Sequence, residues 1–335
     1  MTTEATLNRR SNESDGSVLL SGRRLLLARS AWAMVTLAGI GLFVAGLPLH
    51  YRTLLSACTA GDCAAGQLTP ATMQALQEAG IDPAAYATYL VGLSVLVAVV
   101  HCAVGLLIVW RQSRERMALL ASLWLITLGL TLTEGEVRAL AAAYPALQLP
   151  ALALIWLGGV VLLVLFMFTF PDGRFVPGWS RWLYPLVVLA MALIVALQSA
   201  GGGEPLVELW GLMILGGITA QVYRYLRVSG PVQRQQTKWV MAGLLLLAGA
   251  VAFLFVYDSA RWMLGSVDLD EAVTLLVNTT VASLAFLVIP VTVAFSVLRY
   301  RLWDTDRLIN RTLVYGLLTA VLVLLYFSSV VLLQQ

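Results

Sequence analysis

The chain has 335 residues, of which 60% are hydrophobic and only 12% are charged, and its mean hydropathy is +0.86. Soluble domains average about 45–50% apolar and about 25% charged residues, so this composition excludes an ordinary soluble domain and indicates an integral membrane protein. The net charge of +3 at pH 7 does not indicate a nucleic-acid partner. The basic residues flank apolar segments, where the lipid bilayer itself and its anionic headgroups are the expected partner.

Long apolar segments follow a polar tail over residues 1–30, so residues 31–335 are expected to form one multi-span membrane domain. About 20 apolar residues in a helix cross roughly 30 Å of hydrocarbon. We therefore predict an all-α, polytopic transmembrane bundle of about nine spans. The predicted spans are residues 31–49, 84–110, 117–137, 151–170, 182–199, 206–226, 239–257, 272–298 and 312–333.

Basic residues occupy alternate connections between these spans. All 21 Lys and Arg residues except Arg52, Arg138 and Arg261 lie in the tail or in every second gap. Because Lys and Arg are retained on the cytoplasmic side during insertion, the N-terminus is predicted to be cytoplasmic. Nine crossings then place the C-terminus outside, directly after an apolar segment. We therefore expect the sequence to be truncated after residue 335, with a tenth span missing.

The largest outer connection, residues 50–83, contains a closely spaced cysteine pair. Cys58 and Cys63 enclose four residues, and thiols outside the cytoplasm can oxidise, so we predict a disulfide-closed loop. Two free thiols are the alternative, and no other ligand cluster accompanies them to form a metal site. A lipoprotein cleavage site before Cys58 is a further alternative, but polar residues separate it from the first span.

The remainder of this outer connection contains helix signals. Thr69 followed by Pro70 predicts the start of a short helix, and Gly80 predicts its end. Asp82 followed by Pro83 predicts that the second span begins above the membrane surface. Such a cap could bind a ligand or could be a rigid lid, and the sequence leaves both open.

Three inner connections carry polar motifs. In residues 170–179, Pro171-Asp172-Gly173 is typical of a tight turn. Residues 229–239 contain a Ser-Gly-Pro start followed by a polar helix start. Residues 299–311 are predicted to form an interfacial cytoplasmic segment, in which opposed charges share one helical face.

Together these stretches resemble the membrane-embedded input region of bacterial multi-pass sensor histidine kinases, the group that pairs with LuxR-type response regulators. That family has segments similar to FPDGRFVP at 170–177, RQQTKWV at 234–240 and RYRLWD with INRT from residue 299 onward. The resemblance covers about residue 50 to the end. Gly178 and Thr305 depart mildly from the family pattern, at positions with no known catalytic role.

The resemblance implies a function in two-component signal transduction at the bacterial plasma membrane. It implies a tenth span, a sensory domain, a dimerisation helix with a phospho-accepting His and an ATP-binding domain, none of which is in this sequence. We therefore expect this chain to be the sensor module, with no catalytic residues, no cofactor and no metal of its own. Homodimerisation and binding of the response regulator would both occur through the missing kinase part.

A small set of residues is predicted to couple the spans to that kinase. The candidate coupling residues are Asp172, Arg174, Arg234, Asp304, Asp306 and Arg307, and the candidate hinge is Pro290 in the eighth span. Proline removes one hydrogen bond of a helix, so a kink is expected there. Turn formation and membrane anchoring by positive charges are the alternative roles of the coupling residues.

The alternatives to a sensor are a small-molecule transporter and an accessory membrane subunit. A transporter normally places ionisable groups near the bilayer midplane, whereas the central portions of spans four to seven contain none. Glu134, Glu136 and Arg138 are expected at the outer water interface of the third span. His50 and His101 differ in predicted depth by roughly 15 Å, too far to share one haem.

Overall fold

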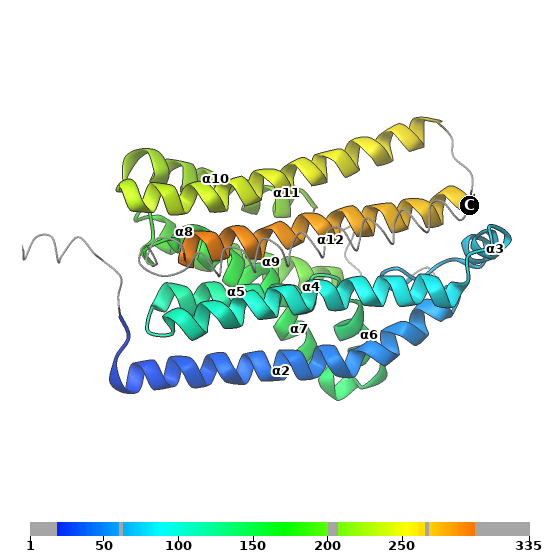
Figure 1. Cartoon of the computed structure of the whole chain (residues 1–335), viewed down its shortest axis with the longest axis horizontal. Helices are drawn as coiled ribbons and strands as arrows, with labels where there is room; N and C mark the ends of the chain where they lie inside the picture. Colours follow the sequence, from blue (N-terminus) through cyan, green and yellow to red (C-terminus); the bar gives the residue numbers. More distant parts are fainter. Residues whose placement is uncertain (1–18, 60–62, 200–206, 265–267, 299–335) are drawn as a thin grey trace, which may run out of the picture.

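The computed structural model describes residues 19–59, 63–199, 207–264 and 268–298, and these form a bundle of helices (Figure 1). Two short helices, η1 and η2, belong to the segment that leads into α8. The elements in chain order are α2 Gly22–Leu55, α3 Pro70–Glu78, α4 Pro83–Gln112, α5 Arg116–Thr131, α6 Gly135–Ala143, η1 Pro145–Leu147, α7 Gln148–Trp156, η2 Leu157–Leu162, α8 Leu163–Thr169, α9 Ser180–Ser199, α10 Val207–Arg227, α11 Pro231–Leu264 and α12 Asp268–Leu298.

Among the described residues, five helical segments are long and apolar enough to cross a membrane. A sixth results if the bent pair α5 and α6 counts as one span. The five are α2, α4, the segment Pro145–Thr169, and the apolar parts of α11 and α12. Every predicted span up to residue 298 falls on a helix or on consecutive helices. The count of nine stays a prediction, because α9 and α10 are not among these candidate segments and residues 312–333 lie outside the described residues.

The third predicted span is broken, which corrects the expectation of one helix over residues 117–137. α5 ends at Thr131, α6 begins at Gly135, and the two helices are bent by 67°. Glu134 adopts a left-handed backbone conformation, with φ of 53°, between them. The sequence does contain polar residues here, but their pattern predicts the outer water interface for Glu134 and Glu136 and not a break.

The fourth predicted span is also irregular. Between α7 and α8 the backbone forms a π-helical turn, η2, over Leu157–Leu162. A π turn contains one extra residue and leaves the regular hydrogen-bond pattern of the α-helix, and such turns occur frequently at functional sites. Gly158 allows η2 to approach α5 closely, since an added Cβ would lie 2.9 Å from the carbonyl carbon of Thr127.

α5 lies at the centre of the main core. From Ala118 to Thr131 nearly all its residues are buried, whichever way they face. Trp124 stacks on Phe166 with ring centroids 4.5 Å apart, and Phe166 packs on Phe170 at 4.8 Å. A largely apolar helix is expected in such an enclosed position, and the polar side chains of Ser122, Thr127 and Thr131 each donate a hydrogen bond to a backbone carbonyl.

α2, by contrast, lies at the edge of the bundle, beside α4, α5 and α6 (Figure 1). Many of its large apolar side chains are exposed, for example Leu26 at 71% and Leu37 at 70%, whereas Phe43 and Leu54 face the bundle. A contiguous apolar surface of this kind marks a membrane-facing side. α2 therefore separates one side of the bundle from lipid.

The predicted helix starts of the outer connection are confirmed. The Thr69 hydroxyl accepts a hydrogen bond from Thr72 N at 3.2 Å, and the Asp82 carboxylate accepts one from Ala84 N at 3.0 Å. Gly80 ends α3 with a positive φ of 78°, a conformation that glycine adopts without strain. α12 continues as one helix through Pro290, and the hinge at this residue stays a prediction.

Candidate functional site

The inner connection after α8 forms the tight turn that the sequence predicts. The Asp172 carboxylate accepts a hydrogen bond from Arg174 N at 3.0 Å, and Gly173 N donates to Thr169 O at 2.8 Å. Gly173 has a positive φ of 77°, which suits glycine at this position. Two candidate coupling residues, Asp172 and Arg174, therefore belong to one ordered turn.

This turn is held by a buried arginine of α10. Arg224 is 2% exposed, and its guanidinium donates to the Phe170 carbonyl and the Asp172 carboxylate. It also donates to the Arg174 carbonyl at 2.7 Å. Arginine suits this role because its planar group presents several donors in fixed directions. We call Arg224 with Phe170, Asp172 and Arg174 the Arg224 clamp.

Gln221 extends the clamp by one turn of α10. Its Nε2 donates to the Phe170 carbonyl at 3.2 Å and also to the Met167 carbonyl. These carbonyls lie at the end of α8, where backbone oxygens lack partners within the helix. From the sequence, we interpreted Arg224 only as one of the positive charges that flank an inner connection. Its position three residues after Gln221, on an otherwise apolar helix, could have indicated a buried polar site.

The structure does not bring the other candidate coupling residues into this site. Arg234 is exposed near the start of α11, and its guanidinium carbon lies 6.0 Å from the ring centroid of Tyr225 in α10. Asp304, Asp306 and Arg307 lie outside the described residues. The structure thus joins Asp172 and Arg174 in one site and leaves the coupling role of all six residues a prediction.

The inner connections meet at one end of the bundle. Leu20 N donates to Arg114 O at 2.9 Å, next to the start of α2. Gln112 Nε2 donates to Val297 O at 3.1 Å, and Ser296 Oγ donates to Gln236 O at 2.9 Å. The alternation of charges predicted this shared end, although its cytoplasmic side stays a prediction.

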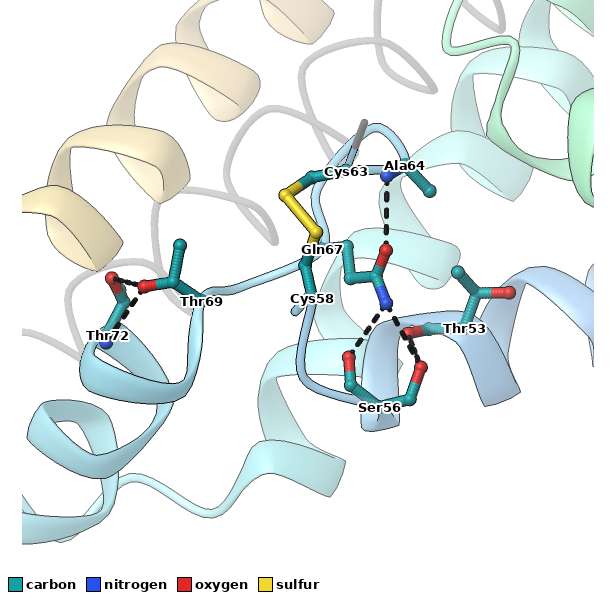
Figure 2. Close-up of a disulfide and its surroundings, with 8 residues drawn as sticks. All are labelled: Thr53, Ser56, Cys58, Cys63, Ala64, Gln67, Thr69 and Thr72. Carbon is teal, nitrogen blue, oxygen red and sulfur yellow. Dashed lines mark hydrogen bonds between the residues drawn. A yellow bond between two sulfur atoms is a disulfide. The ribbon is translucent and has the colours of Figure 1, made fainter. Parts of the chain in front are cut away.

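The outer connection forms a compact cap that contains the expected disulfide, Cys58–Cys63 (Figure 2). Gln67 lies beside it and crosslinks the cap, since its side chain accepts from Ala64 N at 3.1 Å and donates to Ser56 O at 3.0 Å. Tyr86 at the start of α4 donates to Gly66 O at 2.8 Å. These bonds tie the cap to the bundle.

Apolar residues fill the space beneath this cap. Buried side chains from α2, the cap, α3 and α4 form one cluster, namely Leu54, Leu68, Leu76, Tyr86, Ala87 and Leu90. Leu54 and Leu76 are 0% exposed. This packing favours the rigid lid over the ligand-binding cap among the two possibilities that the sequence left open.

A second buried polar group lies at the break between α5 and α6. Glu136 is 0% exposed, whereas it was expected at the water interface with Glu134 and Arg138. Its carboxylate accepts hydrogen bonds from Ser94 at 2.5 Å and Thr133 at 2.9 Å. The break turns Glu136 inward, and this bend is why the expectation was wrong.

The break is also packed tightly against α2. A methyl group at Gly46 would overlap the Glu136 carbonyl, and one at Gly135 would overlap the ring of His50. His50 is itself only 5% exposed. His101, in the middle of α4, is 0% exposed and its Nδ1 lies 2.9 Å from Val97 O. The two histidines therefore occupy separate, buried environments.

Residues 72–122 match a protein-family model described as MHYT, a bacterial signalling protein N-terminal repeat. The match covers most of α3, all of α4 and the beginning of α5. No curated protein and no solved structure matches the chain. With the apolar helices described above, the match indicates a membrane sensory module of a bacterial signalling protein.

Proposed function

We propose that the chain is the membrane input module of a two-component sensor histidine kinase in the bacterial plasma membrane. It relays a stimulus to a cytoplasmic kinase core that lies beyond this sequence, and it performs no catalysis and binds no cofactor itself. Dimerisation occurs through the kinase part, and the response regulator binds only there. The family match supports the sensory class. The resemblance of the inner motifs supports the kinase.

The Arg224 clamp is the observation that carries the proposal. It fixes the turn between α8 and α9 to the inner end of α10, which is followed closely by α11. A rearrangement among the spans that moves α8 must therefore move α10 as well. Packed helices with fixed contacts transmit such shifts as discrete changes of arrangement.

The last turn of α12 provides the exit from the bundle. Val297 accepts a hydrogen bond from Gln112 of α4, and Ser296 donates to Gln236 of α11. The conspicuous motif that starts at Arg299 follows directly. Movement of α11 against α4 would thus act on the segment that leads towards the proposed kinase.

The transporter and accessory-subunit alternatives are not favoured, because the matched family consists of signalling proteins. The gene provides the first test. We expect the reading frame to continue beyond Gln335 into a further span, a helix with a phospho-accepting His and an ATP-binding domain. A stop codon at that point, or a continuation into an unrelated output domain, would contradict the histidine-kinase assignment.

The second test uses the full-length protein in lipid vesicles with labelled ATP. We expect autophosphorylation, and we expect Arg224→Lys to change its level by about fivefold or more, the range of ordinary allosteric coupling. Lysine keeps the charge but cannot form the forked hydrogen bonds. Arg227→Lys on the exposed side of α10 is the matched control and should behave as wild type. Equal phosphorylation of both variants would remove the role of the clamp.

A further inference from the structure

A cavity of about 260 Å³ lies inside the bundle, between α5, η2, α8, α10, α11 and α12. Its lining is largely apolar, with Trp124, Met167, Leu247 and Phe286 among the side chains. Thr131 lies in the wall, and so does Glu134, whose carboxylate forms an ion pair with Arg138. Among the described lining residues, no charged group is left unpaired.

Both irregular stretches of backbone border this cavity. Gly159 of the π turn lines one part, and Thr131, Leu132 and Glu134 from the break after α5 line another. Within a membrane, backbone that departs from the regular helix is tolerated only where it is buried in protein or lines a cavity. Two such departures therefore line the same cavity.

The chemistry of the wall defines the ligand. A cavity of about 150 Å³ lined by apolar side chains stays dry and accepts benzene, so this larger space accepts a molecule larger than benzene. Trp124 contributes an aromatic part of this wall. A charged ligand would lose its hydration here without compensation, so the wall favours an uncharged molecule.

The cavity adjoins the contacts that support the Arg224 clamp. The side chain of Met167 lines the cavity, while its carbonyl accepts a hydrogen bond from Gln221. Gly217, which also lines the cavity, precedes Gln221 by one turn of α10 and packs against Met167. A molecule in the cavity therefore contacts α8 and α10 directly beside the bonds that hold them together.

We infer that this cavity binds an uncharged, largely apolar molecule with one or two rings. Resting on the proposed function, we further infer that this binding changes the α8–α10 contact and so regulates the kinase. The stimulus would then enter from the lipid phase, and the outer cap would only close the bundle.

Benzophenone is a suitable probe, because it is uncharged, has two rings and one carbonyl, and crosslinks to nearby C–H groups under ultraviolet light. We expect saturable crosslinking of the protein in lipid nanodiscs, with adducts mapped by mass spectrometry to cavity residues such as Met167. Leu247→Trp, which fills the cavity from α11, should abolish these adducts. Leu246→Trp is the matched control, since Leu246 is 60% exposed on the outside of the same helix.

Trp124→Phe keeps an aromatic ring but enlarges the cavity, so it provides a test that does not depend on the folding of a bulky variant. It should change the benzophenone concentration at which crosslinking saturates by about twofold or more, because the ligand loses part of its contact surface. Adducts spread over the lipid-facing side chains and unchanged in Leu247→Trp and Trp124→Phe would overturn the binding site.

Autophosphorylation of the full-length protein separates this inference from the proposed function. A response to benzophenone in wild type and in Leu246→Trp, but not in Leu247→Trp, would support regulation through the cavity. Mapped binding with unchanged phosphorylation would overturn regulation by this cavity. Absence of phosphorylation under every condition would contradict the proposed kinase function, while the crosslinking result would still decide the binding site.

Discussion

Arg224 holds a positive charge at 2% exposure, a position that is costly for a cation unless its partners are fixed. The turn with Asp172 supplies those partners, as two backbone carbonyls and one carboxylate. The sequence predicted the turn at Asp172 but not its contact with Arg224. A turn follows from neighbouring residues, whereas the pairing joins positions about fifty residues apart.

Loss of the Arg224 side chain should therefore destabilise the protein. Breaking a buried ion pair by removing one partner costs about 3–5 kcal/mol, because the other charge is left without compensation. We expect Arg224→Met to lower the thermal midpoint in detergent well below that of Arg227→Met, which removes an exposed charge from the same helix. Equal midpoints for the two variants would show that the clamp contributes little to stability.

Gly46 supports a second prediction for single residues. A methyl group there would overlap the Glu136 carbonyl, whereas one at Gly41 on the same helix meets nothing within 4 Å. Gly46→Ala should lower the free energy of unfolding by about 1–3 kcal/mol through overpacking. Gly41→Ala should be neutral or stabilising by up to about 1 kcal/mol, because alanine favours helices more than glycine. Denaturant titration followed by helix content would test both.

At the level of elements, the start signals at Thr69 and Asp82 were readable because a cap depends on residues two or three positions apart. The break after Thr131 and the π turn that begins at Leu157 were not predicted from the sequence. The π turn lies within continuous apolar sequence, whereas the polar residues Glu134 and Glu136 at the break were expected at the water interface. The burial of Glu136 follows from the break and was missed with it.

The cap gives a prediction for an element. A disulfide between Cys58 and Cys63 closes a short loop, and the chain-entropy estimate for such a loop is about 2 kcal/mol. Cys58→Ser with Cys63→Ser should therefore loosen the cap and increase hydrogen exchange in α3, while exchange at the inner end stays unchanged. Cys102→Ser in α4 is the control. Reagents for free thiols should modify Cys58 and Cys63 only after reduction.

On the scale of the whole molecule, charge alternation predicted which connections meet at one end. The contacts of Gln112 with Val297 and of Ser296 with Gln236 confirm that shared end. The alternation of charges could predict this shared end because it depends only on the order of the apolar segments along the chain. It could not yield the cavity or the clamp, since these depend on which faces of distant helices meet.

The side of the membrane on which each end lies is testable by cysteine labelling of intact cells. We expect a membrane-impermeant maleimide to modify Gln77→Cys on the exposed face of α3 before lysis. Gly178→Cys in the inner turn, where an added side chain meets nothing within 4 Å, should be modified only after lysis. Cys102→Ser provides the background for both. The reverse labelling pattern would invert the orientation and remove the inner turn from the cytoplasm.

The burial of α5 and the pairing of Arg224 also bear on how the chain is made. A helix is inserted before the helices that follow it in the chain, so α5 is expected to contact lipid until α8 and α12 have been synthesised. Its largely apolar circumference suits that environment, because lipid tails are as apolar as leucine, and the Thr127 and Thr131 hydroxyls donate to carbonyls of the same helix. The charge of Arg224 would be costly in lipid without a partner, but the turn that contains Asp172 is synthesised about fifty residues earlier. Biosynthetic order thus presents the arginine with its carboxylate at once, and reversing that order by circular permutation should reduce the yield of inserted protein.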